Sequence, residues 1–340
     1  MRSLVECRFW EQAEKGSVRC NLCPHRCLIP PNGVGACRVR KNINGKLYTL
    51  VYGLASSIAV DPIEKKPFYH FEPGSHVLSL STWGCNLRCP HCQNWEISQT
   101  EPLEHFSRKI SPEDVVRYLK ETQADGISWT YNEPTIWYEF IYDASKLVRE
   151  ETDAYITWVT NGFINEAPLR KIAPYVDGMN VDYKGPEEAY KLFGGRLDPV
   201  KRTITLAYDL GIHVELTYLI IPTVNDSNRS IEEFIEFVKS LDPEIPVHFT
   251  RFFPHYKMRH LPPTPIETLI KAYETAKEKG LKYVYVGNII DETYNTTYCP
   301  ECGRPVIRRS VLAITQYDVI DGRCKYCGHP IRIWSRKTLR

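Results

Sequence analysis

The stretch HVLSLSTWGCNLRCPHCQNW, residues 76–95, joins a short apolar run to three closely spaced cysteines. The apolar half, residues 76–83, has the length and composition of a buried strand. Directly after it, Cys85, Cys89 and Cys92 form a C-x3-C-x2-C loop. Three thiolates in one short loop can bind three irons of a four-iron cluster, which leaves the fourth iron open to an exogenous ligand. A structural zinc site, which would need a fourth ligand, or a set of buried thiols is the alternative.

This apolar run is the first of a series, and helical patterns lie between its members. The runs occupy residues 76–83, 126–131, 155–160, 178–183, 213–221, 247–253 and 282–287. One helical pattern begins at Ser111 with Asp114 three positions later, which is an acidic variant of the capping box. Strands that alternate with helices of this length predict a parallel sheet with right-handed crossovers. We therefore expect an α/β fold with a full or partial (β/α) barrel, (β/α)6 being the first choice, and an open doubly wound sheet as the alternative.

Polar residues gather just after several of these runs, where parallel α/β folds place their chemistry. They are Asn132, Glu133, Asn161, Asp182, Lys184, Asn225 and Asp226. Residues two apart on a strand share a face, so Asp182 and Lys184 can point into a barrel together. Glu133 can accept a hydrogen bond from a ligand ammonium group and Lys184 can pair with a carboxylate, the two charges of a bound amino acid. A simple internal salt bridge between Asp182 and Lys184 is the alternative, and a plain turn is the alternative at Asn161.

Four of the twelve cysteines close the chain in two C-x2-C pairs. They are Cys299, Cys302, Cys324 and Cys327. Pairs at this separation predict a zinc ribbon, and four thiolates complete the coordination shell of a structural site. Gly303 and Gly328 follow the two pairs, where a backbone able to take positive φ lets amide groups turn toward the sulfurs. A single iron of the rubredoxin kind is the alternative, and the ribbon either docks a protein or RNA or simply caps the structure.

A second group of cysteines lies near the N-terminus. Its spacing is C-x2-C-x3-C-x9-C, formed by Cys20, Cys23, Cys27 and Cys37. Four ligands in so short a segment suit zinc, which we favour, and an auxiliary iron–sulfur cluster is the alternative. We expect Cys7 to be a buried or spare thiol.

The cysteine distribution suggests three parts and a reducing compartment. No cysteine occurs at positions 93–298, whereas a secreted disulfide framework would spread its bridges through the fold. We expect an N-terminal Cys-rich metal-binding module at 1–74, a barrel at 75–292 and the zinc ribbon at 293–340.

Charge and hydropathy exclude several classes of protein. The 43 basic and 41 acidic side chains give a net charge of +2, so no strong field attracts nucleic acid or membrane. The charged start lacks the apolar run of a signal peptide, and no stretch approaches the roughly 18 apolar residues of a membrane span. We expect a cytoplasmic protein without membrane contact.

The cysteine loop at the end of the first predicted strand resembles the signature of the radical S-adenosylmethionine (SAM) superfamily. His91 occupies the position before the last cysteine, which is usually aromatic there. The segments that end the next strands agree in order with that superfamily and its glycyl-radical-enzyme activases. They are Tyr131-Asn132-Glu133-Pro134, Thr160-Asn161-Gly162 and Asp182-Tyr183-Lys184. The resemblance implies a radical SAM type of barrel with Glu133 and Asn132 at the SAM amino group, Lys184 and Asp182 at its carboxylate or ribose, His91 near the adenine, and Asn161 in the same site.

A closer resemblance, which runs nearly end to end, is to the radical SAM enzyme of the AmmeMemoRadiSam system. It rests on DPIEKKPFYHF at 61–71, on Gly84-Cys85-Asn86 and on CQNW at 92–95. This resemblance implies partners from the other two families of that system and leaves the substrate open. Glycyl-radical-enzyme activases lack both terminal cysteine groups and carry a glycine pair where this chain has Tyr131 and Asn132, so their activity does not transfer.

Together these resemblances imply an enzyme with a [4Fe–4S] cluster at Cys85, Cys89 and Cys92. The cluster would cleave SAM to a 5′-deoxyadenosyl radical, with an electron donor such as ferredoxin or flavodoxin, and the radical would take hydrogen from a macromolecule. We expect a protein substrate. The alternatives are an RNA substrate, favoured by the basic stretch 38–46, a glycyl-radical-enzyme activase, and a metal-binding adaptor without catalysis.

Overall fold

The computed structural model describes residues 4–336, and an eight-stranded sheet lies at its centre. Seven of the strands run parallel in the order β16-β15-β14-β13-β12-β11-β9. They are β9 (His76–Ser81), β11 (Gly126–Trp129), β12 (Tyr155–Thr160), β13 (Gly178–Asp182), β14 (His213–Ile220), β15 (Val247–Arg251) and β16 (Val284–Gly287). Strand β8 (Ser57–Pro62) adds to β9 in the antiparallel sense. Within residues 4–336, β16 and β8 are the two edge strands of the sheet and do not pair with each other, so the barrel is partial.

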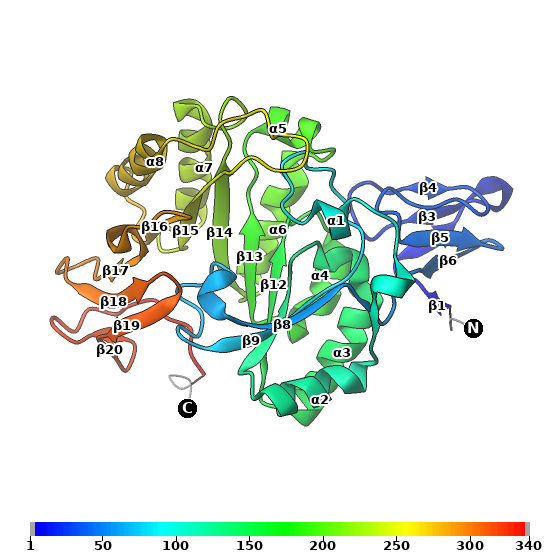
Figure 1. Cartoon of the computed structure of the whole chain (residues 1–340), viewed down its shortest axis with the longest axis horizontal. Coiled ribbons are helices and arrows are strands. Elements are labelled where there is room, and N and C mark those ends of the chain that lie inside the picture. Colours follow the sequence, from blue (N-terminus) through cyan, green and yellow to red (C-terminus); the bar gives the residue numbers. More distant parts are fainter. Residues whose placement is uncertain (1–3, 337–340) are drawn as a thin grey trace.

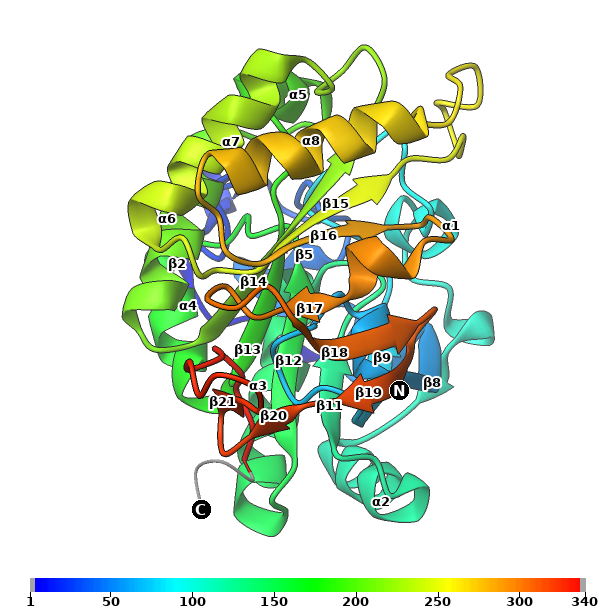
Figure 2. The same cartoon turned by 90° about the vertical axis from the view of Figure 1, so that its left-hand side faces the viewer.

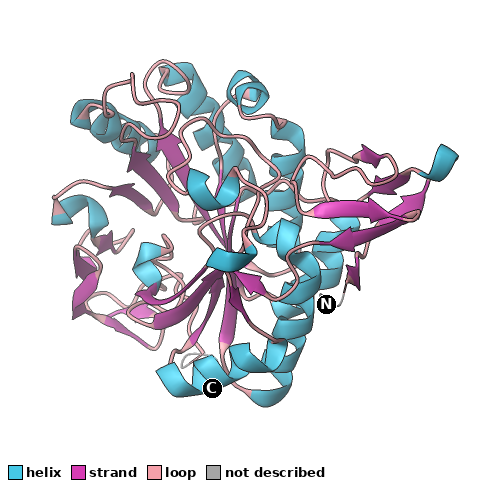
Figure 3. Ribbon diagram, turned by 45° about the vertical axis from the view of Figure 1, so that its right-hand side comes forward, coloured by secondary structure: helices cyan, strands magenta, loops and turns pink. Residues whose placement is uncertain are grey.

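A helix follows each of the first six parallel strands and leads to the next strand. These helices are α2 (Pro112–Thr122), α3 (Tyr138–Glu151), α4 (Glu166–Ile172), α6 (Leu197–Asp209), α7 (Asn228–Leu241) and α8 (Ile266–Glu278). They lie outside the fan of strands (Figure 3). Six strand–helix units confirm the expected α/β fold with a partial (β/α)6 barrel, and the parallel strand β16 follows as a seventh.

Local sequence explains where these elements begin and end. The Ser111 side chain accepts a hydrogen bond from Asp114 N and the Asp114 carboxylate accepts one from Ser111 N, so the predicted capping box opens α2. Gly211 and Gly280, with φ of +79° and +101°, follow the ends of α6 and α8. The residues of β11 are all buried, because helices or neighbouring segments cover both faces of a parallel sheet.

The segment 63–71, which begins with η2 (Ile63–Lys65), crosses the amino ends of the strands and fills the bottom of the barrel. Phe68 and Phe71 lie against Gly178 at the start of β13, where a Cβ atom would come within 3.1 Å of the Phe71 ring. The backbone N–H groups of Tyr69 and His70 donate to the buried Glu215 carboxylate of β14 at 3.0 and 2.7 Å. The segment is therefore part of the barrel core.

The N-terminal residues form two small sheets at one side of the barrel (Figure 1). Their strands are β1 (Val5–Glu6), β2 (Trp10–Gln12), β3 (Val18–Cys20), β4 (Leu28–Ile29), β5 (Arg40–Ile43) and β6 (Lys46–Thr49), with η1 (Glu14–Gly16) between β2 and β3. A buried ion pair from Arg40 Nη2 to Glu139 Oε2 of α3, 2.6 Å long, joins this module to the barrel.

The C-terminal residues form another small module at the other side, next to β16 (Figures 1 and 2). Its elements are η6 (Glu292–Asn295), β17 (Thr297–Tyr298), β18 (Pro305–Ser310), β19 (Ala313–Tyr317), β20 (Val319–Ile320) and β21 (Arg323–Cys324). The division of the chain at residues 74 and 292 stays a prediction, and its end parts include residues 1–3 and 337–340, which lie outside the described residues.

The remaining elements are short. They are β7 (Leu54–Ala55), α1 (Trp95–Ser98), η3 (Glu104–Phe106), β10 (Arg108–Lys109), η4 (Pro134–Trp137), η5 (Ala173–Tyr175) and α5 (Glu187–Leu192). Within residues 4–336 we find no helix with both the length and the apolar character that a bilayer crossing requires.

Candidate functional site

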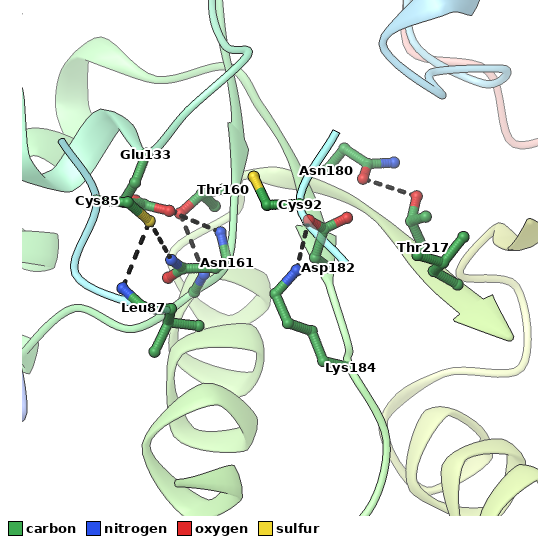
Figure 4. A network of polar contacts seen from close by, with 12 residues as sticks. Cys85, Leu87, Cys92, Glu133, Thr160, Asn161, Asn180, Asp182, Lys184 and Thr217 are labelled. Carbon is green, nitrogen blue, oxygen red and sulfur yellow. Dashed lines mark hydrogen bonds and ion pairs between the residues drawn. The ribbon is translucent and has the colours of Figure 1, made fainter. Parts of the chain in front are cut away.

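A cavity of about 590 Å³ opens at the carboxyl ends of the parallel strands. Every residue that the sequence suggested for the cluster or for SAM lines it. These residues are Cys85, Cys89, His91, Cys92, Asn132, Glu133, Asn161, Asp182 and Lys184. Residues from the loop after β9 and from the ends of β11, β12 and β13 thus meet in one place. Figure 4 labels Cys85, Cys92, Glu133, Asn161, Asp182 and Lys184 among them.

The 85–92 loop is held in place by the end of the neighbouring strand. Asn132 Nδ2 donates to the carbonyl oxygens of Thr82 and Gly84 at 2.9 and 2.8 Å and fixes the turn before Cys85. Gly84 has φ of +88°, and a Cβ atom there would come within 2.6 Å of the Cys37 carbonyl oxygen. Asn132, expected at the SAM amino group, is thus engaged with the backbone before the loop.

The three sulfurs of the loop have few protein partners. Leu87 N and Asn161 Nδ2 lie 3.4 and 3.7 Å from Cys85 Sγ, and Cys92 Sγ lies 3.1 Å from Ser98 Oγ. Burial raises the pKa of the Cys89 thiol to about 12. A bound cationic centre is what would convert such buried thiols to thiolates, so this donor set suits a metal cluster.

Glu133 is buried, and its carboxylate joins the ends of two strands. Oε1 accepts hydrogen bonds from Thr135 N, Thr135 Oγ1 and Thr160 Oγ1 at 3.0, 2.6 and 2.7 Å. Oε2 accepts one, from Asn161 N at 2.8 Å, and keeps a lone pair for a further donor. Burial raises the pKa of Glu133, while these hydrogen bonds oppose the rise.

Lys184 and Asp182 form the ion pair that sequence reasoning offered as an alternative, with Lys184 Nζ 3.0 Å from Asp182 Oδ2. Burial disfavours the ammonium charge, but Asp182 and Cys89 together hold the pKa of Lys184 above its ordinary value. Both side chains also line the cavity, so the pair presents one fixed cation and one carboxylate to it.

His91 is buried between the loop and α5, with its ring centroid 4.7 Å from that of Phe193. Burial, and secondarily the Lys184 charge, lowers its pKa to about 3, so the imidazole is neutral at physiological pH. Its Nδ1 atom is buried without a hydrogen-bond partner in the protein. This atom is a polar group free to bind a ligand.

A cluster of charged residues from the 61–71 motif forms another part of the cavity wall. Asp61 accepts from Lys65 Nζ and Lys66 Nζ, both at 2.7 Å, and also from Tyr131 Oη. Lys66 Nζ lies 4.2 Å from the centroid of the Tyr131 ring. Lys65, Lys66 and Tyr131 line the cavity. The two adjacent lysines of the motif can be recognised in the sequence. The ion pairs that Asp61 forms with both of them cannot.

The two terminal cysteine groups differ in geometry. In the C-terminal ribbon, Cys299 Sγ lies 3.6 Å from Cys327 Sγ and Cys302 Sγ lies 3.8 Å from Cys324 Sγ. These four ligand atoms all lie within 4.8 Å of one another, and residues 4–336 contain no other such group of three or more. The ribbon therefore forms a metal site with four cysteines. The N-terminal group lines a separate small cavity with Arg40, and Cys7 is buried nearby.

Comparisons with known proteins agree with this geometry. The model of the Radical SAM superfamily matches residues 80–238. The uncharacterized protein MJ0808 of Methanocaldococcus jannaschii is 46% identical over 332 residues, which covers 96% of this chain and 99% of that protein.

More distant relatives have named activities. The pyruvate formate-lyase-activating enzyme of Clostridium pasteurianum is 22% identical over 46% of this chain and 67% of its own length. Among solved structures, a radical SAM methyltransferase from Sphaerobacter thermophilus aligns with a TM-score of 0.47 at 17% identity, over 84% of this chain and 77% of that one.

Proposed function

The chain belongs to the radical SAM superfamily, whose members are enzymes, and on that premise we propose that it takes a hydrogen atom from a protein substrate. The observation that carries the proposal is the single cavity where the three cysteines of the 85–92 loop meet Glu133 and Lys184. When bound, a [4Fe–4S] cluster and SAM supply the chemistry, the one-electron cleavage of SAM to methionine and a 5′-deoxyadenosyl radical.

The residues present fit these two groups. Cys85, Cys89 and Cys92 offer three sulfur donors on the cavity wall, which leaves one iron of a cubane for a ligand. The unpartnered Nδ1 of His91 is a buried polar atom beside these donors, and its neutral ring suits an uncharged partner such as adenine. Within residues 4–336, no three ligand atoms at the 85–92 loop lie close enough together to bind a single zinc ion.

For SAM, the chain supplies partners to both charges of its amino-acid end. Glu133 Oε2 has the capacity to accept from the ammonium group. Lys184 carries a fixed positive charge for the carboxylate, with Asp182 beside it for the ribose hydroxyls. Asn161 orients the Cys85 sulfur, and Asn132 acts on the loop backbone.

A protein substrate is favoured over RNA because two of the basic residues in the stretch 38–46 already form ion pairs within the protein. Arg40 is buried against Glu139, and Lys46 Nζ pairs with Glu6 at 3.3 Å. The net charge of +2 adds no general attraction for phosphate. The relative from Clostridium pasteurianum, an activating enzyme of another protein, points the same way.

We further propose the surroundings in which this enzyme works. Its partners are the proteins of the AmmeMemoRadiSam system and a one-electron donor such as ferredoxin or flavodoxin. The C-terminal ribbon binds zinc, because sulfurs 3.6–3.8 Å apart match a tetrahedron with bonds of about 2.3 Å. A reducing compartment, the cytoplasm, keeps its cysteines free for metal.

The test is 5′-deoxyadenosine formation from SAM by anaerobic protein with dithionite. We expect the wild type to form it and the triple variant Cys85→Ala, Cys89→Ala, Cys92→Ala to form none. Cys7→Ala serves as a control that removes a buried thiol outside the cavity. Activity retained by the triple variant would contradict the assignment of the site.

The substrate is tested separately, by incubation in deuterated solvent with candidate partner proteins and with cellular RNA. We expect deuterium or a mass change in a protein. Label confined to RNA would overturn the choice of a protein substrate while leaving the SAM chemistry in place.

A further inference from the structure

The N-terminal cysteine group (Cys20, Cys23, Cys27 and Cys37) surrounds a small cavity between β3, β4 and η4. The chain folds back on itself there, with Cys20 N donating to Cys27 O at 2.9 Å. Ala36 N lies 3.4 Å from Cys27 Sγ. All four cysteines therefore line one small cavity, where Cys20 and Cys37 are buried and Cys23 and Cys27 are partly exposed.

Arg40 shares this cavity and lacks partners for part of its charge. The side chain is 1% exposed, and only Nη2 has a partner, Glu139 Oε2 at 2.6 Å. Nε and Nη1 are buried without hydrogen bonds. A buried guanidinium with unpaired N–H groups is costly, so its place among four cysteines indicates an anionic centre that it neutralises.

The distances between the sulfurs distinguish between kinds of centre. A single zinc with bonds of about 2.3 Å holds its sulfurs about 3.8 Å apart. The sulfur pairs of the C-terminal ribbon have this spacing, at 3.6 and 3.8 Å. No three ligand atoms of the N-terminal group lie within 4.8 Å of one another, and the same is true of the 85–92 loop. The wider spacing favours a cluster in which each sulfur binds a different iron.

The N-terminal group also touches the 85–92 loop directly. The Cys37 carbonyl oxygen packs against Gly84, and a Cβ atom added to Gly84 would lie 2.6 Å from that oxygen. His25 Nε2 lies 2.6 Å from the carbonyl oxygen of Asn86. Two residues that flank Cys85 thus contact the segment that carries Cys23 and Cys37.

From these observations we propose that Cys20, Cys23, Cys27 and Cys37 bind an iron–sulfur cluster beside Arg40, and that it relays single electrons to the site at the 85–92 loop. A ferredoxin or flavodoxin is oxidised as it reduces this cluster by one electron. The cluster then loses that electron to the neighbouring site, and no bond forms or breaks. The relay rests on the proposed function, whereas the cluster site does not.

Metal analysis of the full chain tests the site. We expect the triple variant of Cys85, Cys89 and Cys92 to Ala, reconstituted anaerobically, to keep roughly four iron and four sulfide per chain and an EPR signal on reduction. Adding Cys20→Ala and Cys37→Ala removes both. Zinc in place of iron, or no metal beyond the ribbon, would overturn the proposal.

Two results of these measurements distinguish the inference from the proposed function. If the wild type forms 5′-deoxyadenosine but the triple variant holds no iron, the inference fails and the proposed function stands. If both clusters form but no 5′-deoxyadenosine appears with dithionite, the proposed function fails and the cluster site stands.

Arg40 is tested through the reduction potential, in the triple-variant background. The double change Arg40→Gln and Glu139→Gln removes both buried charges. Changing Glu139 as well avoids leaving its buried carboxylate without a charged partner. We expect the potential of the N-terminal cluster to fall, because Arg40 lines the cavity of the four cysteines while Glu139 does not, and the nearer charge, a cation, favours the more negative reduced state. Lys41→Gln, on the same strand, is the control, and an equal shift there would contradict the role of Arg40.

The relay is tested by reduction kinetics. We expect Cys20→Ala with Cys37→Ala to slow the reduction of the cluster at the 85–92 loop by flavodoxin, followed optically. Dithionite, a small reductant, should reduce that cluster in wild type and variant alike. An unchanged rate with flavodoxin would overturn the relay.

Discussion

At the scale of single residues, Glu133 serves both the protein and its proposed ligand. Its four hydrogen bonds tie η4 to the end of β12, so the carboxylate stabilises the fold before any ligand binds. The remaining lone pair of Oε2 lies in a preformed position for an ammonium group. Such a residue should lose stability and binding together when its charge is removed.

Glu133→Gln tests this double role. The amide must place an NH2 group against either Asn161 N or the Thr135 and Thr160 donors, so a buried hydrogen bond is lost. We expect a decrease of about 1–3 kcal/mol in the free energy of unfolding, by urea denaturation, and weaker SAM binding. Glu166→Gln, on an exposed ion pair with Arg170, is the matched control and should change stability by less than about 1 kcal/mol. Equal effects of the two changes would contradict the role of Glu133.

His70 makes a second prediction at this scale, about pH. Its ring is buried between Arg332 O at 2.6 Å and Tyr285 Oη at 2.5 Å, and burial lowers its pKa to about 3. The unfolded chain binds the proton near pH 6.5, while the folded chain does not until about pH 3. Stability therefore falls as the pH decreases from about 6.5 to 3, by up to about 1.4 kcal/mol per pH unit for this group.

Urea midpoints measured between pH 7 and pH 4 check this prediction. His70→Gln should lower stability at pH 7 and make the remaining pH dependence shallower. His260→Gln, at an exposed position, should leave the slope unchanged. A slope in His70→Gln as steep as that of the wild type would rule out His70 as its source.

At the scale of elements, the contact between the N-terminal module and the 85–92 loop depends on Gly84. Gly84→Ala brings a Cβ atom to 2.6 Å from the Cys37 carbonyl oxygen, at a φ of +88°. Gly211 also has a positive φ, of +79°, but a Cβ atom added there by Gly211→Ala would have no atom within 4 Å. The two changes therefore share the conformational cost and differ in the steric one.

We expect Gly84→Ala to lower the free energy of unfolding by about 1–3 kcal/mol more than Gly211→Ala does. It should also lower the iron content, because the turn before Cys85 must move. Urea denaturation and iron analysis of both variants measure this. Equal losses in both variants would show that the close contact with Cys37 has no energetic weight.

Elements are also the scale at which sequence reasoning succeeds or fails. The capping box at Ser111 and the alternation of strands and helices are local patterns, and both were confirmed. The antiparallel addition of β8 and the insertion of 63–71 depend on contacts between distant residues, such as Tyr69 N with Glu215. The spacing of apolar residues along the sequence cannot predict that the Glu215 carboxylate accepts a hydrogen bond from a residue 146 positions away.

The candidate site shows the same division. Strand ends place Glu133, Asn161 and Lys184 on one edge by topology alone, so their meeting was predictable from the order of elements. That Asn132 binds the backbone before the loop, and that Asp61 gathers two lysines at the cavity, depends on side-chain geometry. The binding roles of these residues stay predictions.

At the scale of the whole molecule, the C-terminal ribbon closes the barrel at the end opposite the cavity. Arg309 Nη2 donates to Tyr69 O at 2.6 Å, and Trp334 stacks on Phe71 with ring centroids 4.2 Å apart. Both contacts fall on the 63–71 segment, which also contains Lys65 and Lys66 of the cavity wall. The ribbon thus supports the bottom of the barrel, in agreement with the capping role offered from sequence.

Removal of the ribbon metal tests this support. We expect a zinc-binding chelator, or Cys302→Ser with Cys327→Ser, to lower hydrogen-exchange protection in β18 and β19 and also at residues 68–72. The two changed cysteines are exposed, so their substitution removes ligands without opening the core. The 84–92 region should keep its protection, because its contacts are with the N-terminal module, Asn132, Phe193 and Lys257 rather than with the ribbon. Loss confined to the ribbon would show that it folds independently of the barrel, and loss that reached residues 84–92 would show that the metal supports the whole fold.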